Sequence, residues 1–275
     1  MTATAAATPV LSLKGISKRF GAVQALTDAE IDVMPAEVVA LVGDNGAGKS
    51  TLVKVISGVG PANDGTILWE GKEVTISRPQ DAQKLGIATV YQDLALADNL
   101  DVVGNLFLGQ EERRFGVLDD IDMERQAREL LQTLSVKIPS VRTQVASLSG
   151  GQRQSVAIAR SLLGEPKVVI LDEPTAALGV AQTAEVLSLI KRLKERGYGV
   201  LLISHNLADI FEVADRIVVL RLGRMAGLFD AHSNSSEDVV AAITGASDSA
   251  ALDRERQRLG RSHGEAGSGD EGVQS

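Results

Sequence analysis

The chain has 275 residues, of which 44% are hydrophobic, 23% are charged and 3% are aromatic, and its formal net charge is -8. The length predicts one or two soluble domains, and the scarcity of aromatic side chains predicts an aliphatic core that suits a buried parallel sheet. The acidic balance argues against nucleic acid as a partner. The lack of cysteine excludes disulfides, thiolate metal sites and cysteine nucleophiles.

The N-terminal part of the chain predicts an antiparallel β region. Residues 1–9 are rich in Thr and Ala, and we expect a disordered segment there, not a signal or transit peptide. Strand-like segments follow near Val10 and from Leu26 to Met34, and then a hairpin with its turn at Glu70-Gly71. No apolar run reaches the ~20 residues that a membrane-spanning helix needs.

From Val38 onward, apolar runs alternate with helical stretches, which predicts parallel strands joined by right-handed crossovers. Between Asp93 and Leu163 the pattern is mostly helical and predicts an inserted helical lobe, with one helix over Asp122–Leu134. Residues 247–275 contain few large apolar side chains, which predicts a disordered tail after a domain of residues 10–246. The apolar runs are Val38–Val42, Ile87–Tyr91, Val168–Leu171, Val200–Ile203 and Ile217–Leu220.

A glycine-rich segment after Val38–Val42 fits the phosphate-loop pattern, in which Gly and four further residues precede Gly-Lys-Ser. Backbone N–H groups and a helix N-terminus would hold nucleotide phosphates there, Lys49 would reach the β- and γ-phosphates, and the Ser50 hydroxyl would ligate Mg²⁺. The flanking strand and helix patterns favour nucleotide binding over a chance glycine-rich turn. The predicted cofactor-binding residues here are Gly43, Asp44, Asn45, Gly46, Ala47, Gly48, Lys49, Ser50 and Thr51.

Two adjacent carboxylates follow the apolar run Val168–Leu171. Ligands bind at the carboxyl ends of parallel strands, so Asp172 is a candidate Mg²⁺ ligand. Glu173 is placed to orient and deprotonate an attacking water, as a general base. On its own, Asp-Glu-Pro after a strand would more often be a turn.

A second candidate anion site precedes the helical stretch Val156–Leu163, in Leu148-Ser149-Gly150-Gly151-Gln152. One ATP cannot occupy two such sites in one small lobe. The second site therefore indicates a head-to-tail pair of subunits in which Ser149, Gly150, Gly151 and Gln152 face the nucleotide of the partner. A plain helix N-cap is the alternative interpretation.

With these motifs in this order, the sequence resembles the ATP-binding subunits of ABC transporters over about Val10 to Thr244. The resemblance implies an α/β fold, namely a P-loop NTPase ABC ATPase domain with a mostly parallel sheet core, an N-terminal antiparallel β subdomain and an inserted helical subdomain over about residues 93–163. The matching motifs are Walker A at Gly43–Ser50, a Q-loop glutamine at Gln92, the signature at Leu148–Gln152, Walker B ending at Asp172 before Glu173, and a switch histidine at His205.

The same resemblance implies roles for three further residues. Phe20 would stack on adenine, although an ordinary core Phe is the alternative. Gln92 would ligate Mg²⁺ and couple the site to a membrane partner, and His205 would contact the γ-phosphate. The sequence departs from many members at Gly179, where they carry aspartate, which puts the usual contact of that loop across the pair in doubt.

The details of these motifs most resemble single-cassette importers of monosaccharides of the ribose, xylose and fructose type. That resemblance implies an ATPase using ATP and Mg²⁺ at the cytoplasmic face of the membrane, paired with a second copy of itself on a membrane permease, and served indirectly by a sugar-binding protein outside the membrane. The alternative is a soluble ABC ATPase acting on DNA or the ribosome. Only 98 residues lie between Ser50 and Ser149, too few for the long coiled coils typical of that class.

Overall fold

The computed structural model describes residues 8–114 and 116–246. The predictions for the N-terminal segment and the C-terminal tail therefore lie outside the described residues, apart from residues 8 and 9. None of the helices in the described part is long and apolar enough to cross a membrane. In chain order, the strands are β1 (Leu11–Phe20), β2 (Val23–Val33), β3 (Val38–Val42), β4 (Asp64–Trp69), β5 (Lys72–Val74), β6 (Ile87–Val90), β7 (Arg113–Arg114), β8 (Val117–Leu118), β9 (Val168–Asp172), β10 (Gly199–Ile203), β11 (Arg216–Arg221) and β12 (Arg224–Asp230).

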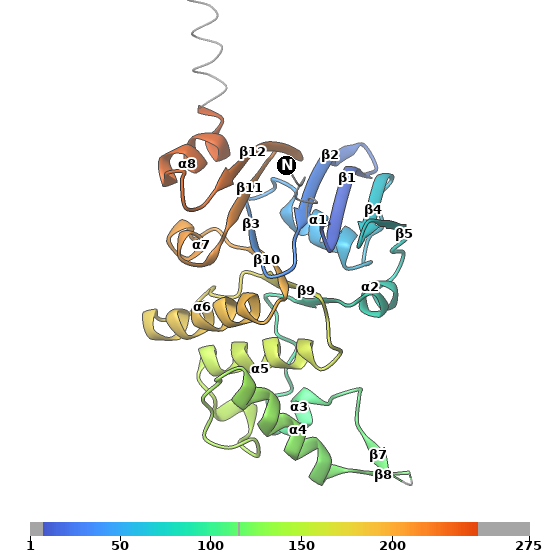
Figure 1. The fold of residues 1–275 in the computed structure, drawn as a ribbon, viewed down its shortest axis with the longest axis vertical. Helices are drawn as coiled ribbons and strands as arrows, with labels where there is room; N and C mark the ends of the chain where they lie inside the picture. The colour runs from blue at the N-terminus through green and yellow to red at the C-terminus, as the bar shows by residue number, and fades with distance from the viewer. Residues whose placement is uncertain (1–7, 115, 247–275) are drawn as a thin grey trace, which may run out of the picture.

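The helices lie between these strands and cover the sheets. They are α1 (Lys49–Ile56), α2 (Pro79–Leu85), α3 (Val102–Leu106), α4 (Asp120–Thr133), the short 3-10 helix η1 (Val145–Ser147), α5 (Gly150–Leu162), α6 (Val180–Glu195), α7 (Leu207–Val213) and α8 (Ser236–Thr244). Figure 1 shows an upper part that contains both large sheets and a lower part that contains α3, α4 and the β7–β8 hairpin, with α5 and α6 between them.

Two sheets organise the described residues. A six-stranded sheet has the order β12-β11-β3-β10-β9-β6, and its strands β11, β3, β10, β9 and β6 are parallel, as the alternating apolar runs predicted. A four-stranded antiparallel sheet of order β2-β1-β4-β5 forms the predicted N-terminal β region, and its β4–β5 turn lies at Glu70-Gly71 as expected. The sequence did not predict β12, which pairs antiparallel with β11.

The helical lobe is only partly as predicted. The helix expected over Asp122–Leu134 is present as α4, which buries Met123, Ala127 and Leu131. The lobe also contains the antiparallel β7–β8 hairpin, which the mostly helical pattern did not predict. Asp119 caps α4 by accepting a hydrogen bond from the backbone N–H of Asp122 at 3.1 Å, which fixes where the helix begins after the hairpin.

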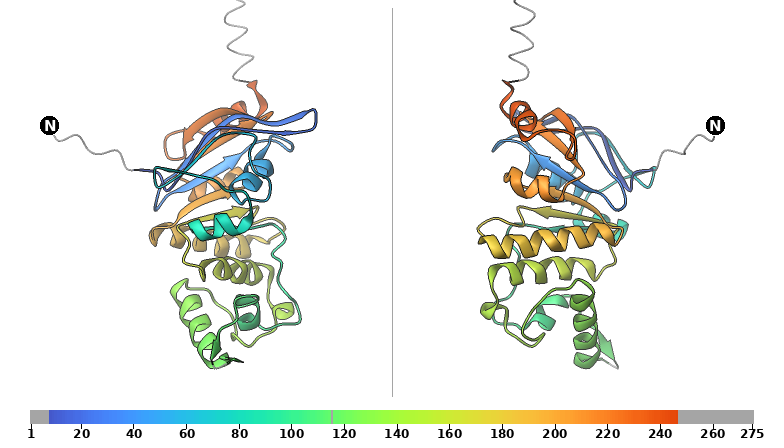
Figure 2. Two further views of the ribbon diagram at one scale, coloured as in Figure 1. Left: turned by 90° about the vertical axis from the view of Figure 1, so that its right-hand side faces the viewer. Right: turned by 60° about the vertical axis from the view of Figure 1, so that its left-hand side comes forward.

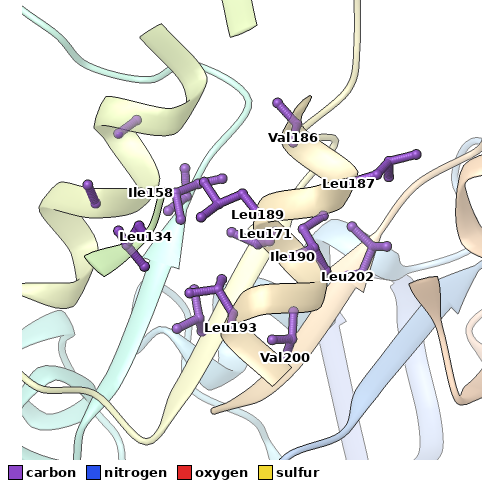
Figure 3. Packing of buried hydrophobic residues seen from close by; sticks show 14 of the residues in the cluster. Leu134, Ile158, Leu171, Val186, Leu187, Leu189, Ile190, Leu193, Val200 and Leu202 are labelled. Carbon is purple, nitrogen blue, oxygen red and sulfur yellow. The ribbon is translucent and has the colours of Figure 1, made fainter. Parts of the chain in front are cut away.

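The core forms two clusters, one on each face of the parallel sheet. Successive side chains of a strand point to opposite faces, so Ala40 packs with the helical side while Val39 and Leu41 pack with the antiparallel sheet and α1. Figure 3 shows the helical side, where Ile158 of α5 and Leu193 of α6 lie near Leu171 and Val200 of the parallel strands. Figure 2 shows the antiparallel sheet on one side of the parallel strands and α5 and α6 on the other. The parallel sheet is therefore buried on both faces. A ligand can reach it only at the ends of its strands.

One partly buried carboxylate joins the starts of β3 and β11 to the end of α6. Asp215 accepts the backbone N–H of Val38 at 2.9 Å and pairs with Lys194 of α6, and His232 lies 3.6 Å away. Burial tends to raise the pKa of Asp215, but the hydrogen bonds from Lys194 and from the Val38 N–H hold it below its ordinary value. The ionised carboxylate therefore stabilises the fold.

We expect Asp215→Asn to lower the free energy of unfolding by about 1–3 kcal/mol at pH 7, because the charged partner of Lys194 is lost. Since the folded-state pKa is depressed, the wild-type advantage should be complete above the unfolded pKa of about 4 and should shrink as the pH falls below it. Urea titrations from pH 7 down to about pH 2 measure this, with the exposed Asp64→Asn as control. An equal loss of unfolding free energy at every pH would contradict a stabilising role for the Asp215 charge.

Candidate nucleotide-binding site

The glycine-rich segment forms a tight loop between β3 and α1, as predicted. Gly43 has φ +148°, and a Cβ there would lie 2.1 Å from the carbonyl oxygen of Leu220. Gly48 has φ +109°, and a Cβ there would lie 2.8 Å from the carbonyl oxygen of Ala25. Only glycine fits both positions, so the loop can approach β2 and β11 and turn its backbone N–H groups towards a ligand.

The loop lines a cavity of about 560 Å³ together with residues from distant parts of the chain. The Walker B strand β9 contributes Asp172 and, just beyond its end, Glu173, and the segment after β6 contributes Gln92. The structure thus brings together most of the residues that the sequence predicted for one nucleotide site. The lining residues are Val23, Gln24, Ala25, Asn45, Gly46, Ala47, Gly48, Lys49, Ser50, Thr51, Gln92, Asp172, Glu173, Ile203, Leu222 and Gly223.

Lys49 is the first residue of α1 and is held by the loop that precedes it. Its ammonium donates to the carbonyl oxygen of Gly43 at 2.6 Å and to that of Asp44 at 3.1 Å. An ammonium has three donors and rotates freely about its last bond. The side chain is therefore already placed over the loop, where it can exchange carbonyl partners for phosphate oxygens.

Glu173 adopts an unusual backbone conformation at the end of β9. Its φ is +52°, in the left-handed region that a residue other than glycine rarely occupies, and its N–H donates to the carbonyl oxygen of Ile203 at 2.9 Å. Strained residues of this kind concentrate at functional sites. The turn directs the Glu173 carboxylate towards the end of the next strand, β10, where His205 begins its own loop.

The side chains of His205 and Glu173 are in contact. The Nδ1 atom of His205 lies 2.8 Å from the Oε2 atom of Glu173. The Glu173 side chain is only 16% exposed, whereas that of His205 is 73% exposed. Glu173 therefore has one oxygen engaged and its other oxygen available beside the cavity, and His205 presents the rest of its ring to solvent.

The Asp172 carboxylate is electrostatically unfavourable in the ligand-free chain. Burial raises its pKa above the ordinary value, the adjacent Glu173 carboxylate raises it further, and the Lys49 ammonium opposes the rise. A cation beside Asp172 would relieve this cost. The direction of the shift is that expected for a functional carboxylate rather than for one that stabilises the fold.

We expect Asp172→Asn to raise the melting temperature of the ligand-free chain at pH 7 by about 1–4 °C. A raised carboxyl pKa means that the folded state binds the proton more tightly than the unfolded state does, so the ionised form costs stability above that pKa. The gain should disappear as the pH falls towards about 4. Thermal melts at both pH values measure this, with Asp44→Asn on the exposed side of the loop as control; a destabilised Asp172→Asn protein would contradict it.

The signature segment does not reach the cavity. Ser149 is exposed and caps α5, because its Oγ accepts the N–H of Gln152 at 3.2 Å while its own N–H donates to Oε1 of Gln152 at 3.0 Å. Gly150 and Gly151 pack against the first turn of α6, where Gln182 lies within 3.4 Å of the Cβ position of either glycine. None of Ser149, Gly150, Gly151 and Gln152 lines the cavity. The second predicted anion site therefore lies apart from the first within one chain.

Phe20 lies at the end of β1 and is not a core residue. Its side chain is 53% exposed, and Lys18 places its Nζ 5.3 Å from the centre of the ring. Phe20 pairs with Val23, which lines the cavity. The exposed ring thus lies next to the site, and adenine stacking stays a prediction.

The structure adds residues that the sequence did not indicate. Leu222 and Gly223, in the turn between β11 and β12, line the cavity beside Val23 and Ala25. Their residue types do not indicate a site, because neither leucine nor glycine has a polar or titratable side chain. Their position follows only from the pairing of β11 with β3, which places the β11–β12 turn above the phosphate loop.

The sequence pattern of the family described as ABC transporter matches residues 26–176. The chain belongs to the ABC transporter family. It is 46% identical over 246 residues to the fructose import ATP-binding protein FrcA of Rhizobium meliloti, an alignment that covers 86% of this chain and 95% of that protein. It is 45% identical to the xylose/arabinose import ATP-binding protein XylG of Sulfolobus acidocaldarius, with 86% of this chain and 92% of that protein covered.

Solved structures agree with the fold. A nucleotide-free ATP-binding cassette from an ABC transporter superposes with a TM-score of 0.75 at 26% identity, over 86% of this chain and 95% of that chain. The ribose import ATP-binding protein RbsA 1 of Rubrobacter xylanophilus is 44% identical over 83% of this chain, which spans 46% of that relative. The predicted resemblance to ATP-binding subunits of ABC transporters, and the predicted ABC ATPase fold, are confirmed.

Proposed function

We propose that this ABC cassette is the ATP-hydrolysing subunit of an importer and that it powers the uptake of a monosaccharide through a separate membrane permease. The observation that supports ATP hydrolysis is the cavity that the phosphate loop lines together with Asp172 and Glu173, with His205 Nδ1 2.8 Å from the Glu173 carboxylate. The relatives that match over almost their whole length are named as fructose and xylose/arabinose import proteins, which supports a monosaccharide as cargo.

In this proposal, each side chain of the cavity has a distinct part in hydrolysis. Lys49 and the backbone N–H groups of the loop bind the β- and γ-phosphates and balance their charge. Glu173 accepts a proton from the attacking water, and His205 keeps the Glu173 carboxylate oriented and contacts the γ-phosphate. Phe20 stacks on adenine at the rim. Phosphoryl transfer needs positioning and charge stabilisation more than covalent chemistry, and these groups supply both.

The cavity also offers oxygen ligands that suit Mg²⁺. The Ser50 hydroxyl, the Gln92 amide oxygen and the Asp172 carboxylate line the same cavity, and the raised pKa of Asp172 indicates a group that a cation would stabilise. No group of three or more His, Cys, Asp or Glu residues in the described part could hold a metal alone. This fits a Mg²⁺ that keeps waters and phosphate oxygens as ligands and, when bound, neutralises charge on the β- and γ-phosphates.

We place a second copy of the chain opposite the cavity. Ser149 is exposed at the N-terminus of α5, and none of Ser149 to Gln152 lines the chain's own nucleotide cavity. A helix N-terminus favours negatively charged groups. A head-to-tail pair would set Ser149 and Gly151 of each copy against the γ-phosphate held by the other. Two ATP molecules would then lie between the two copies.

We propose that the permease docks at a second cavity, which has a volume of about 320 Å³. It adjoins the loop that follows Gln92 and is bounded by α2, α5 and the end of α1, so a cytoplasmic segment of a membrane protein docked there would touch the loop of a nucleotide-site residue. The chain would thereby work at the cytoplasmic face of the membrane. A sugar-binding protein on the other side would act on the permease and would not contact this chain.

Sugar uptake in cells tests the proposal, and the permease need not be identified first. Removing the gene should abolish high-affinity uptake of one labelled monosaccharide among ribose, xylose, arabinose and fructose. The wild-type chain should restore this uptake, whereas Lys49→Ala should not, and Lys54→Ala on the same helix serves as the matched control. Unchanged uptake of every sugar, together with the chain sedimenting with ribosomes or DNA, would favour the non-transport alternative.

A further inference from the structure

Two helices of this cassette share one property. Helix α1 begins at Lys49 of the phosphate loop, and α5 begins directly after Ser149 of the signature segment. Their opposite ends meet at the same groove, the cavity of about 320 Å³ described above, which is lined by Ser57 after the end of α1 and by Arg160 and Ser161 near the end of α5. Each helix thus connects a proposed phosphate contact at its N-terminus to the groove at its C-terminus.

The loop that follows Gln92 is tied to the end of α5 by Arg160. The guanidinium donates to the carbonyl oxygen of Ala95 at 2.9 Å through Nη1 and to that of Leu94 at 2.9 Å through Nη2. Burial lowers the pKa of Arg160, and within residues 8–114 and 116–246 no carboxylate lies within ion-pair distance of it. A partly buried cation with two carbonyl partners and no counter-ion is costly unless those bonds are well aligned.

The loop is shaped to present those two carbonyls. Ala95 has φ +48°, in the left-handed region, and its N–H donates to the Oδ1 atom of Asp93 at 3.1 Å. This turn points two successive carbonyl oxygens at the fixed fork of one guanidinium. The arrangement is specific to arginine, because a lysine ammonium cannot bridge two carbonyls with the same rigid spacing.

The same loop is tied to the end of α1 on the other side of Gln92. The phenol of Tyr91 donates from Oη to the Oγ atom of Ser57 at 3.0 Å. Ser57 is the C-cap residue of α1 and is 4% exposed. The segment from Tyr91 to Ala95 is therefore held to both helices, with Gln92 between the two attachment points and in contact with the nucleotide cavity.

We propose that Arg160 and Tyr91 are positioning residues that link the loop of Gln92 to α5 and α1, so that nucleotide binding and groove occupation control one another. The inference rests on the proposed function for what fills the groove, but the link itself lies within one chain. Movement of α5 relative to α1, which closing over the phosphates would require, pulls on the Arg160 carbonyl bonds and on the Tyr91 hydroxyl at once. An occupant of the groove, in turn, biases the same loop.

Amide hydrogen exchange of the full chain tests the link without a permease. The segment around residues 91–97 is followed with and without a non-hydrolysable MgATP analogue, and analogue affinity is measured in parallel. In the wild type we expect the analogue to slow exchange in this segment by about tenfold, within the usual range of coupling between sites. In Arg160→Lys and in Tyr91→Phe this nucleotide-dependent difference should fall to about twofold or less, with affinity unchanged.

The controls separate coupling from simple loosening. Arg128→Lys on α4 and Tyr198→Phe make the same chemical changes away from the groove and should behave like the wild type. A merely structural role would speed exchange equally with and without the analogue and leave the difference intact, and that result would overturn the proposal. Tyr91→Phe removes one hydroxyl only, so it decides the question even where Arg160→Lys fails to fold.

The outcomes also distinguish this inference from the proposed function. A wild-type chain that does not bind MgATP would contradict the proposed function itself. A wild-type chain that binds MgATP but shows no change in the 91–97 segment would contradict only the link. In the complex with the permease, both variants should keep the basal ATPase rate and lose about tenfold of the stimulation that the permease and its substrate produce.

Discussion

Glu173→Gln should reduce ATP hydrolysis by about 10²- to 10⁴-fold while ATP binding stays within about threefold of the wild type. The amide keeps the size of the side chain and can keep the 2.8 Å contact with His205 Nδ1, but it cannot accept a proton from water. Steady-state phosphate release and binding of a fluorescent ATP analogue measure the two quantities. The expected split, with turnover lost and affinity kept, is what distinguishes a base from a binding group.

The exposed Glu185→Gln on α6 is a control for loss of one carboxylate. A Glu173→Gln chain that hydrolyses ATP at the normal rate would contradict the assignment of the base. His205 would then be the next candidate for the base, since its Nδ1 atom lies 2.8 Å from the Glu173 carboxylate.

Lys49→Ala should weaken MgATP binding by about 100-fold or more and bring turnover below detection, because two or more charge-assisted hydrogen bonds to phosphate are lost. The same substitution removes the bonds from Lys49 to the carbonyls of Gly43 and Asp44, so the melting temperature is measured alongside activity. Lys54→Ala, on the exposed side of α1, removes an ammonium from the same helix and should leave both unchanged. Undiminished hydrolysis by Lys49→Ala would contradict the site.

Much of the site could be predicted because its signals are local in sequence. Gly43 to Ser50 form one continuous segment, a loop and the start of α1, and Asp172 and Glu173 lie at the end of a buried strand. Residue type and spacing are therefore enough to place them. The parallel register of β9 and β10, which aligns Asp172 with Ile203, follows from the buried apolar runs. The contact between Glu173, one residue beyond Asp172, and His205, two residues beyond Ile203, then follows from the register.

Other features depend on tertiary contacts that no short segment encodes. The φ of +52° at Glu173 is set by its hydrogen bond to Ile203, and the turn at Ala95 by Asp93 and Arg160. The β7–β8 hairpin was missed because its strands are two residues each and carry no alternating apolar pattern. The bond of Tyr91 to Ser57 joins residues 34 positions apart in sequence, and no pattern in either segment signals it.

ATP-driven pairing of two cassettes is tested most directly by sedimentation velocity of the Glu173→Gln chain with MgATP or MgADP, with and without Ser149→Arg. MgATP should convert the Glu173→Gln chain from monomer to dimer and MgADP should not, because only ATP offers a γ-phosphate to both halves. Ser149→Arg should restore the monomer by filling the exposed anion site with a bulky cation, whereas Ser147→Arg, two residues away and also exposed, should not. Dimers that form equally with MgADP, or that persist with Ser149→Arg, would contradict the shared nucleotide site.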